Sequence, residues 1–277
     1  MSPWHSQLQL HFRADADRTM VQHRHQGGLR VLASLYPEEA RVCHQVLVHP
    51  PGGLVGGDVI AIETRLQAGT HALVTTPGAS RFYRSTGAPA AQTLDAHLGD
   101  GARLEWLPLE TLAYNGCLGE NRSRFILDPG AELIAWDMLA LGLPAAGAAF
   151  RSGGFTQHIE LPGLWLERGH LAAGDTALLH GPGGLDGRTA LATLVFACGS
   201  PIDPHRRDAL LDAARHVAQA WPAPLRVGAT SPHPQVVVLR ALADRIEPVA
   251  ALLRDVWAAW RHAAWALPAC PPRVWAT

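Results

Sequence analysis

The sequence contains no lysine, and all 23 of its basic residues are arginine. Chemistry that needs a lysine amine, such as a Schiff base or the phosphate contact of a P-loop, is therefore excluded. Cysteine is sparse too: the chain has four single thiols and no Cys-x-x-Cys pair. Isolated thiols argue against a structural zinc site and a disulfide scaffold, and they fit a reducing cytosol.

Long apolar runs and a strong charge imbalance are absent as well. No stretch approaches the roughly 18 apolar residues of a membrane-spanning helix, and the first residues form no apolar signal region. The formal net charge is −1, which gives no field to attract nucleic acid or an anionic membrane. We expect a cytoplasmic protein that binds neither nucleic acid nor membranes.

The first two-thirds of the chain shows the two-residue hydrophobic period of β-strands. Apolar and polar side chains alternate in residues 6–15, 58–66, 92–100 and 154–163. Clusters of glycine, aspartate and proline separate these segments, as expected of turns between strands. The pattern predicts a mainly β fold.

A short Leu-x-x-Gly pattern recurs in the same region, at residues 66–69, 98–101, 127–130 and 171–174. An apolar strand follows the first three copies. Spacings of about 30 residues favour stacked, β-helix-like sheet layers, each covering the apolar face of its neighbour. An ordinary β-sandwich is the alternative.

The last third of the chain has helical periodicity. Asp203 and Pro204 are the N-cap and first residue of a predicted helix that Pro222 and Pro224 end. A valine-rich strand at residues 235–242 and a second helix at 247–267 follow. We expect the tryptophans of the second helix in the core; they are Trp257, Trp260 and Trp265. No linker divides the chain, so we predict one domain over residues 1–277, with two helices in its C-terminal third.

The stretch HPPGGLVGGD, residues 49–58, combines two prolines and four glycines. A P-loop needs a lysine here, and Asp58 would repel phosphate. A dinucleotide fingerprint needs a helix after the glycines, but the next residues form a predicted strand. The glycines therefore indicate a tight turn, and a rigid turn is well suited to present His49 and Asp58 to a ligand.

Two further segments carry candidate functional residues. In TTPGASRFYRSTG, residues 75–87, Arg81 and Arg84 flank an aromatic pair that includes Tyr83; with little net charge, a partner surface or a packed turn is favoured over nucleic acid. Asp137 lies in the apolar segment AWDMLALG, where a carboxylate is costly unless it is hydrogen-bonded or used. Both interpretations of Asp137 remain open at this stage.

A stable metal centre and a hydrolase site lack their usual patterns. His23 and His25 would share one face of a strand and form a two-point ligand, but no third ligand lies nearby in the sequence. The sequence has no His-Glu-x-x-His motif, no Gly-x-Ser-x-Gly motif and no local grouping of serine, histidine and aspartate.

Several long motifs together resemble one known family. HPPGGLVGGD, LVTTPGASRFYRS, LEWLPLETLAYNG and WDMLALGLPAAG occur in an order and at separations similar to those of the urease accessory protein UreD family, also called UreH. The later segments APLRVGATSPHPQVVVLRALAD and PPRVWAT are similar to that family too. The resemblance extends over about residues 5 to 277.

The resemblance implies a non-enzymatic maturation chaperone with stacked sheets in a helix-like arrangement and two helices. It implies that the chain acts with UreF and the GTPase UreG on the urease apoprotein. It also implies that Ni²⁺ is cargo, which passes through an interior route to the dinuclear site of urease, with no tightly bound cofactor. Weak oxygen and imidazole ligands suit such transit, since they bind and release the ion.

The family motifs also suggest individual residues. Asp58, Glu110 and Asp137 match the positions expected to line the nickel route, with His49 beside them. A further set of partner-binding or structural residues comprises Arg81, Tyr83, Arg84, Gly56 and Gly57.

The chain departs from the family pattern at four places. Leu109 stands where glutamine is common and Asn115 where aspartate is frequent. Ala140 and Leu143 replace a usual cysteine and arginine. Two other hypotheses remain: a β-rich enzyme using Asp58, Glu110 and Asp137 as acid/base groups, and a pure scaffold that assembles UreF and urease while nickel travels elsewhere.

Overall fold

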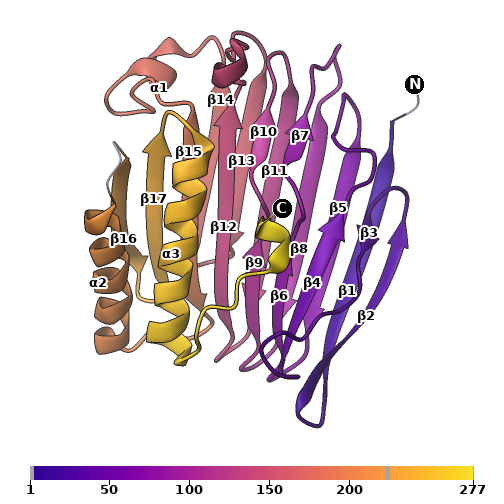
Figure 1. Ribbon diagram of the computed structural model, residues 1–277, viewed down its shortest axis with the longest axis vertical. Helices are drawn as coiled ribbons and strands as arrows, with labels where there is room; N and C mark the ends of the chain where they lie inside the picture. Colours follow the sequence, from indigo (N-terminus) through magenta and orange to yellow (C-terminus); the bar gives the residue numbers. More distant parts are fainter. Residues whose placement is uncertain (1–2, 222–224, 277) are drawn as a thin grey trace.

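The computed structural model describes residues 3–221 and 225–276 of the chain. Two large β-sheets lie face to face, and helices cover one outer side (Figure 1). In spatial order, the seven-stranded sheet consists of β14 (Trp165–Ala172), β13 (Gly154–Leu161), β11 (Leu118–Leu127), β8 (Ala90–Leu98), β5 (Val59–Leu66), β1 (His5–Asp15) and β2 (Arg18–Gln26).

The second sheet is ten-stranded and carries the helices. In spatial order its main path is β16 (Arg226–His233), β17 (Val236–Ala243), β15 (Ala190–Cys198), β12 (Glu132–Leu141), β9 (Arg103–Leu107), β6 (His71–Thr75), β4 (Val42–Val48) and β3 (Arg30–Val31). Two short strands branch from it, β10 (Thr111–Ala113) beside β12 and β7 (Ser80–Phe82) beside β10.

The described residues contain three α-helices and two 3-10 helices: α1 (Thr176–His180), α2 (Pro204–Ala220), α3 (Ile246–Trp265), η1 (Pro144–Ala146) and η2 (Arg273–Ala276). None of these helices is both long enough and apolar enough to span a lipid bilayer.

The chain coils as a β-solenoid of about four turns. From β4 to β13 it contributes, apart from the short β7 and β10, one strand to one sheet and the next to the other. The strands of successive turns pair in parallel, for example β5 with β8 and β6 with β9. The stacked, β-helix-like prediction is thus confirmed, and the two strands of each turn also form the two facing sheets of a sandwich.

The first three Leu-x-x-Gly copies are tight turns of this coil, whereas the fourth, at residues 171–174, lies between β14 and α1. Those at residues 66–69, 98–101 and 127–130 join a strand of the seven-stranded sheet to one of the ten-stranded sheet. Gly69, Gly101 and Gly130 all adopt φ between +63° and +75°, a left-handed region that favours glycine. Backbone bonds stack the turns: Gly69 N–H donates to the Asp100 carbonyl at 2.9 Å, and Gly99 N–H to that of Leu66 at 2.8 Å.

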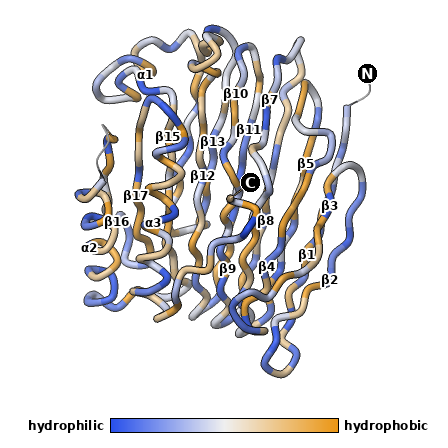
Figure 2. Tube along the Cα trace, in the orientation of Figure 1, coloured by the Kyte–Doolittle hydropathy of each residue, from blue (hydrophilic) through white to orange (hydrophobic). Residues whose placement is uncertain are grey.

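Alternation along each strand builds the core between the sheets. Leu8, Leu10 and Phe12 of β1 are fully buried there, as the two-residue period predicts. Most of the central strands are hydrophobic along their length, whereas the edge at β2 and the outer side of α2 are largely hydrophilic (Figure 2). The outer face of the seven-stranded sheet has no helix over it (Figure 1).

A second core lies between the ten-stranded sheet and the helices. Asp203 caps α2, accepting from His205 and Arg206 N–H groups, and α2 begins at Pro204 as predicted. Its predicted end at Pro222 and Pro224 lies outside the described residues. The tryptophans Trp257, Trp260 and Trp265 of α3 are buried in this core, which confirms the prediction. The five-residue helix α1 was not predicted.

Buried ions cross-link this second core. Arg261 of α3 has no exposed side-chain surface and contacts Glu38 and Glu105, the first at 2.5 Å. His44 bonds Glu38, and His71 bonds Glu105, both at 2.7 Å. Burial acts to raise the pKa of Glu38, but hydrogen bonds from His44 and Arg261 outweigh it and lower that pKa. The network fixes α3 to the sheet.

Candidate functional site

The motif loops all lie at one edge of the solenoid. Strands β4, β6, β9 and β12 are parallel, so their carboxyl ends meet at one edge of the sheet. The loops that leave this edge span residues 49–58, 76–89, 108–117 and 142–153. We call this edge the motif edge; it brings together His49, Asp58, Arg81, Tyr83, Arg84 and Glu110, which the sequence predicted from separate segments.

Asp58 secures the glycine-rich turn at this edge. Its carboxylate is buried and accepts two backbone N–H groups, from Trp4 at 2.8 Å and from Val55 at 2.9 Å. Gly57 has φ +88°, and a Cβ on Gly56 would lie 2.9 Å from the Ala88 carbonyl oxygen. The aspartate and the glycines therefore hold the first strand and the loops together, and a place for Asp58 on a cation route stays a prediction.

A cavity of about 240 Å³ opens beside this turn. Its polar lining comes from His49, Thr76, Ser80, Arg81 and Gln92, among apolar residues such as Trp106. Burial lowers the pKa of His49, against the raising effect of Asp58. The imidazole is thus neutral near pH 7 and can act as a metal ligand.

Exposed aromatic and arginine side chains surround that cavity. Tyr83 is exposed and lies 4.9 Å from Tyr114, measured between ring centroids. Trp4 and Val55 are exposed by 54% and 47%. The guanidinium groups of Arg81 and Arg84 form no ion pair with any residue that the structure describes. This edge accordingly presents exposed guanidinium groups beside exposed apolar side chains.

Glu110 is half-buried in the loop before β10. Its main-chain carbonyl accepts the Ser80 N–H at 2.9 Å. The loop is thereby bonded to the first residue of β7, and Ser80 lines the cavity. Its role as a lining residue stays a prediction.

A line of polar side chains leads from the cavity into the core. Ser80 donates to Gln92 at 3.4 Å, Gln92 to Asn121 at 3.5 Å, and Asn121 to Asp137 at 3.1 Å. Gln157 also hydrogen-bonds Asp137. We call these five residues the internal polar row.

The register of the seven-stranded sheet explains the row. Gln92 of β8, Asn121 of β11 and Gln157 of β13 are direct neighbours in the parallel ladder. All three occupy the inward positions that leucine and phenylalanine hold elsewhere in these strands. A ladder of amides therefore crosses an otherwise apolar core.

Asp137 is the buried acid of this row. Burial raises its pKa to about 6; hydrogen bonds from Gln157 and Asn121 oppose that rise, and the charge of Glu167 adds to it. The carboxyl therefore changes its charge close to physiological pH. When ionised, it is an anionic site inside the core that attracts a cation.

The far end of the row opens at the last strands of both sheets. Thr193 of β15 lies opposite Asp137 in the antiparallel ladder, and its hydroxyl donates to Glu167 of β14 at 2.5 Å. Arg240 of β17 donates to the other oxygen of Glu167 at 2.6 Å. These three residues line a second cavity of about 420 Å³. The internal polar row thus leads from the first cavity to Asp137, and strand register places Asp137 beside Thr193, which lines the second cavity.

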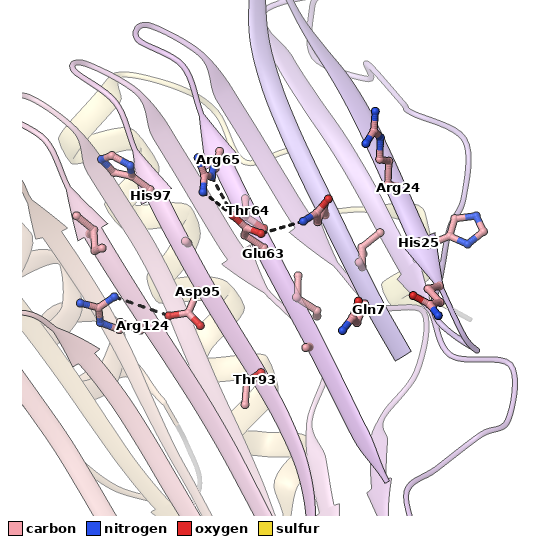
Figure 3. A pocket seen from close by; sticks show the side chains of 17 residues that line it. Gln7, Arg24, His25, Glu63, Thr64, Arg65, Thr93, Asp95, His97 and Arg124 are labelled. Carbon is pink, nitrogen blue, oxygen red and sulfur yellow. Dashed lines mark hydrogen bonds and ion pairs between the residues drawn. The ribbon is translucent and has the colours of Figure 1, made fainter. Parts of the chain in front are cut away.

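The outer face of the seven-stranded sheet is a different surface. The lining of its hollow of about 730 Å³ includes polar and charged side chains that pair within and across strands (Figure 3). Glu63 binds Arg65 at 2.8 Å and Gln9 at 3.1 Å, and Asp95 lies 3.9 Å from Arg124. No residue predicted from the motifs lies there. The acidic side chains Glu63 and Asp95 of this face are thus paired with its own arginines.

His23 and His25 do share one face of β2, as predicted, and their rings stack with centroids 6.2 Å apart. Within residues 3–221 and 225–276, no three histidine, cysteine, aspartate or glutamate side chains gather into a metal site.

Comparison with known proteins identifies the family. Residues 5–276 match the family described as UreD urease accessory protein. The chain is 56% identical over 273 residues to the urease accessory protein UreD of Paracidovorax citrulli (strain AAC00-1), covering 99% of each chain. It is 53% identical over 272 residues to that of Polaromonas sp. (strain JS666 / ATCC BAA-500), covering 98% of this chain and 99% of the relative. The chain belongs to the UreD family.

Membership of the UreD family confirms the resemblance and makes the chain a urease accessory protein that serves urease maturation. The family is not catalytic, which removes the hypothesis of an acid/base enzyme built on Asp58, Glu110 and Asp137.

The departures from the family pattern have structural explanations at some positions. The side-chain oxygen of Asn115 accepts the N–H groups of Arg151 at 2.8 Å and Ser152 at 2.9 Å. An amide oxygen suffices for these bonds, so the loop does not need an aspartate here. Leu109 packs against the second core, and Ala140 is buried in β12.

Sequence reasoning found Asp137 but missed the residues around it. Gln92, Asn121, Gln157 and Glu167 belong to none of the motifs, and Arg240 lies in the family-like segment 223–244 without being singled out there. The available signal was a polar side chain at an inward position of an alternating strand, as with Gln157 between Phe155 and Ile159.

Proposed function

We propose that this UreD family member delivers nickel to the urease apoprotein, together with UreF and UreG, and that the ion moves along the internal polar row. The observation that supports this most is Asp137: a carboxylate in a fully buried strand, linked through Asn121 and Gln92 to the first cavity and in register with Thr193, which lines the second. Burying this carboxylate is costly, and its hydrogen bonds with Gln157 and Asn121 only partly offset that cost, because its pKa stays raised.

The donor set suits transit rather than storage. Amide and hydroxyl oxygens and the carboxylate of Asp137 are spread along the row, with the neutral imidazole of His49 in the cavity at its mouth, instead of converging on one point. Each position can replace part of the hydration shell of Ni²⁺, and none offers the several strong ligands of a stable centre. The ion is cargo in this proposal, and no resident cofactor is required.

The motif edge is the proposed docking site of the protein that passes nickel on. Tyrosine, tryptophan and arginine are the side chains that most often anchor interfaces, and Trp4, Tyr83, Arg81 and Arg84 surround the first cavity. The unpaired arginines favour an acidic partner surface. Docking there would place a donor of nickel, reached through UreF, directly over the mouth of the row.

The test is activation of urease in cells. We expect a urease operon that lacks this gene to yield apoprotein with little nickel and little activity, and expression of this chain to restore both. Metal analysis of purified urease measures the first and ammonia release the second. Full activity and nickel content without this chain would refute the role in maturation.

A further variant separates transit from scaffolding. Asn121→Leu blocks the row next to Asp137 but leaves the motif edge intact. If urease is activated normally by this variant, the chain acts as a scaffold while nickel travels elsewhere.

A further inference from the structure

A single arginine faces the carboxylate at the far end of the internal polar row. Arg240 donates through Nε to Glu167 Oε2 at 2.6 Å, and its terminal nitrogen forms an ion pair with the same oxygen. Thr193 holds the other oxygen of Glu167 at 2.5 Å. Both oxygens of the carboxylate are thus bonded by groups of this chain.

The position of Arg240 is unusual for its strand. Val236, Val238 and Leu242 lie on the same face of β17 as Arg240 and pack in the core between the sheets. Arg240 also lies in register with Thr193, and Thr193 with Asp137. Three adjacent strands therefore carry the polar side chains of Asp137, Thr193 and Arg240 on their inner face. These residues extend the internal polar row toward the second cavity.

The charges of this row do not balance. Asp137 and Glu167 are two carboxylates close enough for Glu167 to influence the ionisation of Asp137, and Arg240 is the cation bonded to Glu167. Removing the guanidinium would leave two adjacent carboxylates with no counter-charge. Such a pair binds a divalent cation strongly and releases it slowly.

We propose that Arg240 is a positioning residue that holds Glu167 while the row is empty and exchanges with the cation in transit. An arriving divalent ion takes the place of the guanidinium on Glu167, and the guanidinium returns when the ion leaves. The two positive charges of the ion are balanced by Glu167 and the ionised Asp137, and the returning guanidinium competes with the ion for Glu167, so the ion is not trapped. The proposal rests on transit through the internal polar row.

Half of the Arg240 side chain is exposed, so the guanidinium can swing into the second cavity without disrupting the core. Arg226 lines the same cavity but forms its ion pair with Asp186, at 2.5 Å. Arg226→Gln removes an equal charge from the same opening and leaves Glu167 bonded. It is the matched control.

The experiment measures binding of Ni²⁺ alone to the full chain by isothermal titration calorimetry near neutral pH. His23→Gln and His25→Gln are present in every variant, so that the stacked histidines of β2 do not mask the signal. We expect Arg240→Gln to bind nickel about tenfold more tightly or better, and to release it correspondingly more slowly to a chelator. Arg240→Lys keeps a cation at the site and should remain close to the parent chain.

Glu167→Gln added to Arg240→Gln should abolish the gain, which a merely structural role of Arg240 would not predict. Unchanged affinity in Arg240→Gln, or an equal gain in Arg226→Gln, would overturn the proposal. Asp137→Asn distinguishes a failure of nickel transit along the row from a failure of the proposed role of Arg240. If it leaves nickel binding unchanged, transit through the row fails; if it weakens binding while Arg240→Gln has no effect, only the role of Arg240 fails.

Discussion

At the scale of the residue, the account depends on one carboxyl group kept where it destabilises the fold. Asp137 replaces an apolar side chain in a strand whose residues are all buried, and burial raises its pKa from 3.8 to about 6. Because the folded-state pKa is the higher one, the folded protein binds the proton more tightly than the unfolded chain. The protonated carboxyl therefore does not oppose folding at low pH, and its ionisation destabilises the folded protein as the pH rises through about 6.

The first prediction follows from the raised pKa of Asp137. Between about pH 4.5 and pH 8, the free energy of unfolding of the native chain should fall by about 2 kcal/mol relative to that of Asp137→Asn, because only the native chain must ionise a buried carboxyl. Urea unfolding at both pH values measures the difference. Asp95→Asn, on the exposed outer face, is the control and should show no such dependence; a pH-independent difference for Asp137→Asn would contradict the assignment.

At the scale of the element, helix α3 is tied to the sheet by ions as well as by tryptophans. Arg261 contacts two glutamates from inside the second core, and the indole N–H of Trp257 donates to Glu105 at 2.5 Å. The oxygens of Glu105 thus form hydrogen bonds with His71 and Trp257 and an ion pair with Arg261. Removing one partner from such a network leaves an uncompensated buried charge, which costs more than the pair itself stabilises.

The second prediction tests this attachment. Arg261→Met should lower the free energy of unfolding by about 3 to 5 kcal/mol, because Glu38 and Glu105 lose their buried counter-charge. Arg254→Met is the matched control on the same helix. Arg254 stacks on Trp275 with its charged carbon 5.2 Å from the ring centroid, so its loss should cost about 1 kcal/mol. Equal costs for the two variants in urea unfolding would show that the buried ions do not hold α3.

The boundaries of helices and strands could be predicted where a single local sequence pattern determines them. The Leu-x-x-Gly copies predicted stacking because a left-handed glycine ends each turn, and Asp203 with Pro204 predicted the start of α2. Helix α1 escaped notice since five residues, TALLH, are too few to show helical periodicity. Strand β12 is buried on both faces, so its sequence lacks the alternation that marks a strand. The sequence alone therefore could not distinguish it from another apolar segment.

At the scale of the whole molecule, the sequence predicted the participants of the motif edge but not its geometry. His49, Asp58, Arg81 and Glu110 come from three segments, and only the parallel register of the ten-stranded sheet brings them together. Asp58 shows the difference: a carboxylate after four glycines suggests a ligand, whereas the structure gives both of its oxygens to backbone N–H groups.

The far end of the row was beyond the reach of the sequence for a similar reason. Glu167 and Arg240 lie 73 residues apart and meet because β14 and β17 lie at the same open end of the two sheets. Register across two facing sheets depends on the whole coil, so no local pattern marks this pair. The interruption of valines by Arg240 was the one visible sign.

The most direct test of the central claim is the nickel content of urease matured with Asp137→Asn in place of the native chain. The account predicts urease with little nickel and little activity, although the variant remains folded and is still captured with its partners in a pull-down from the same cells. Asp95→Asn should mature urease normally. Urease fully loaded with nickel by Asp137→Asn would contradict transit through the interior of this protein.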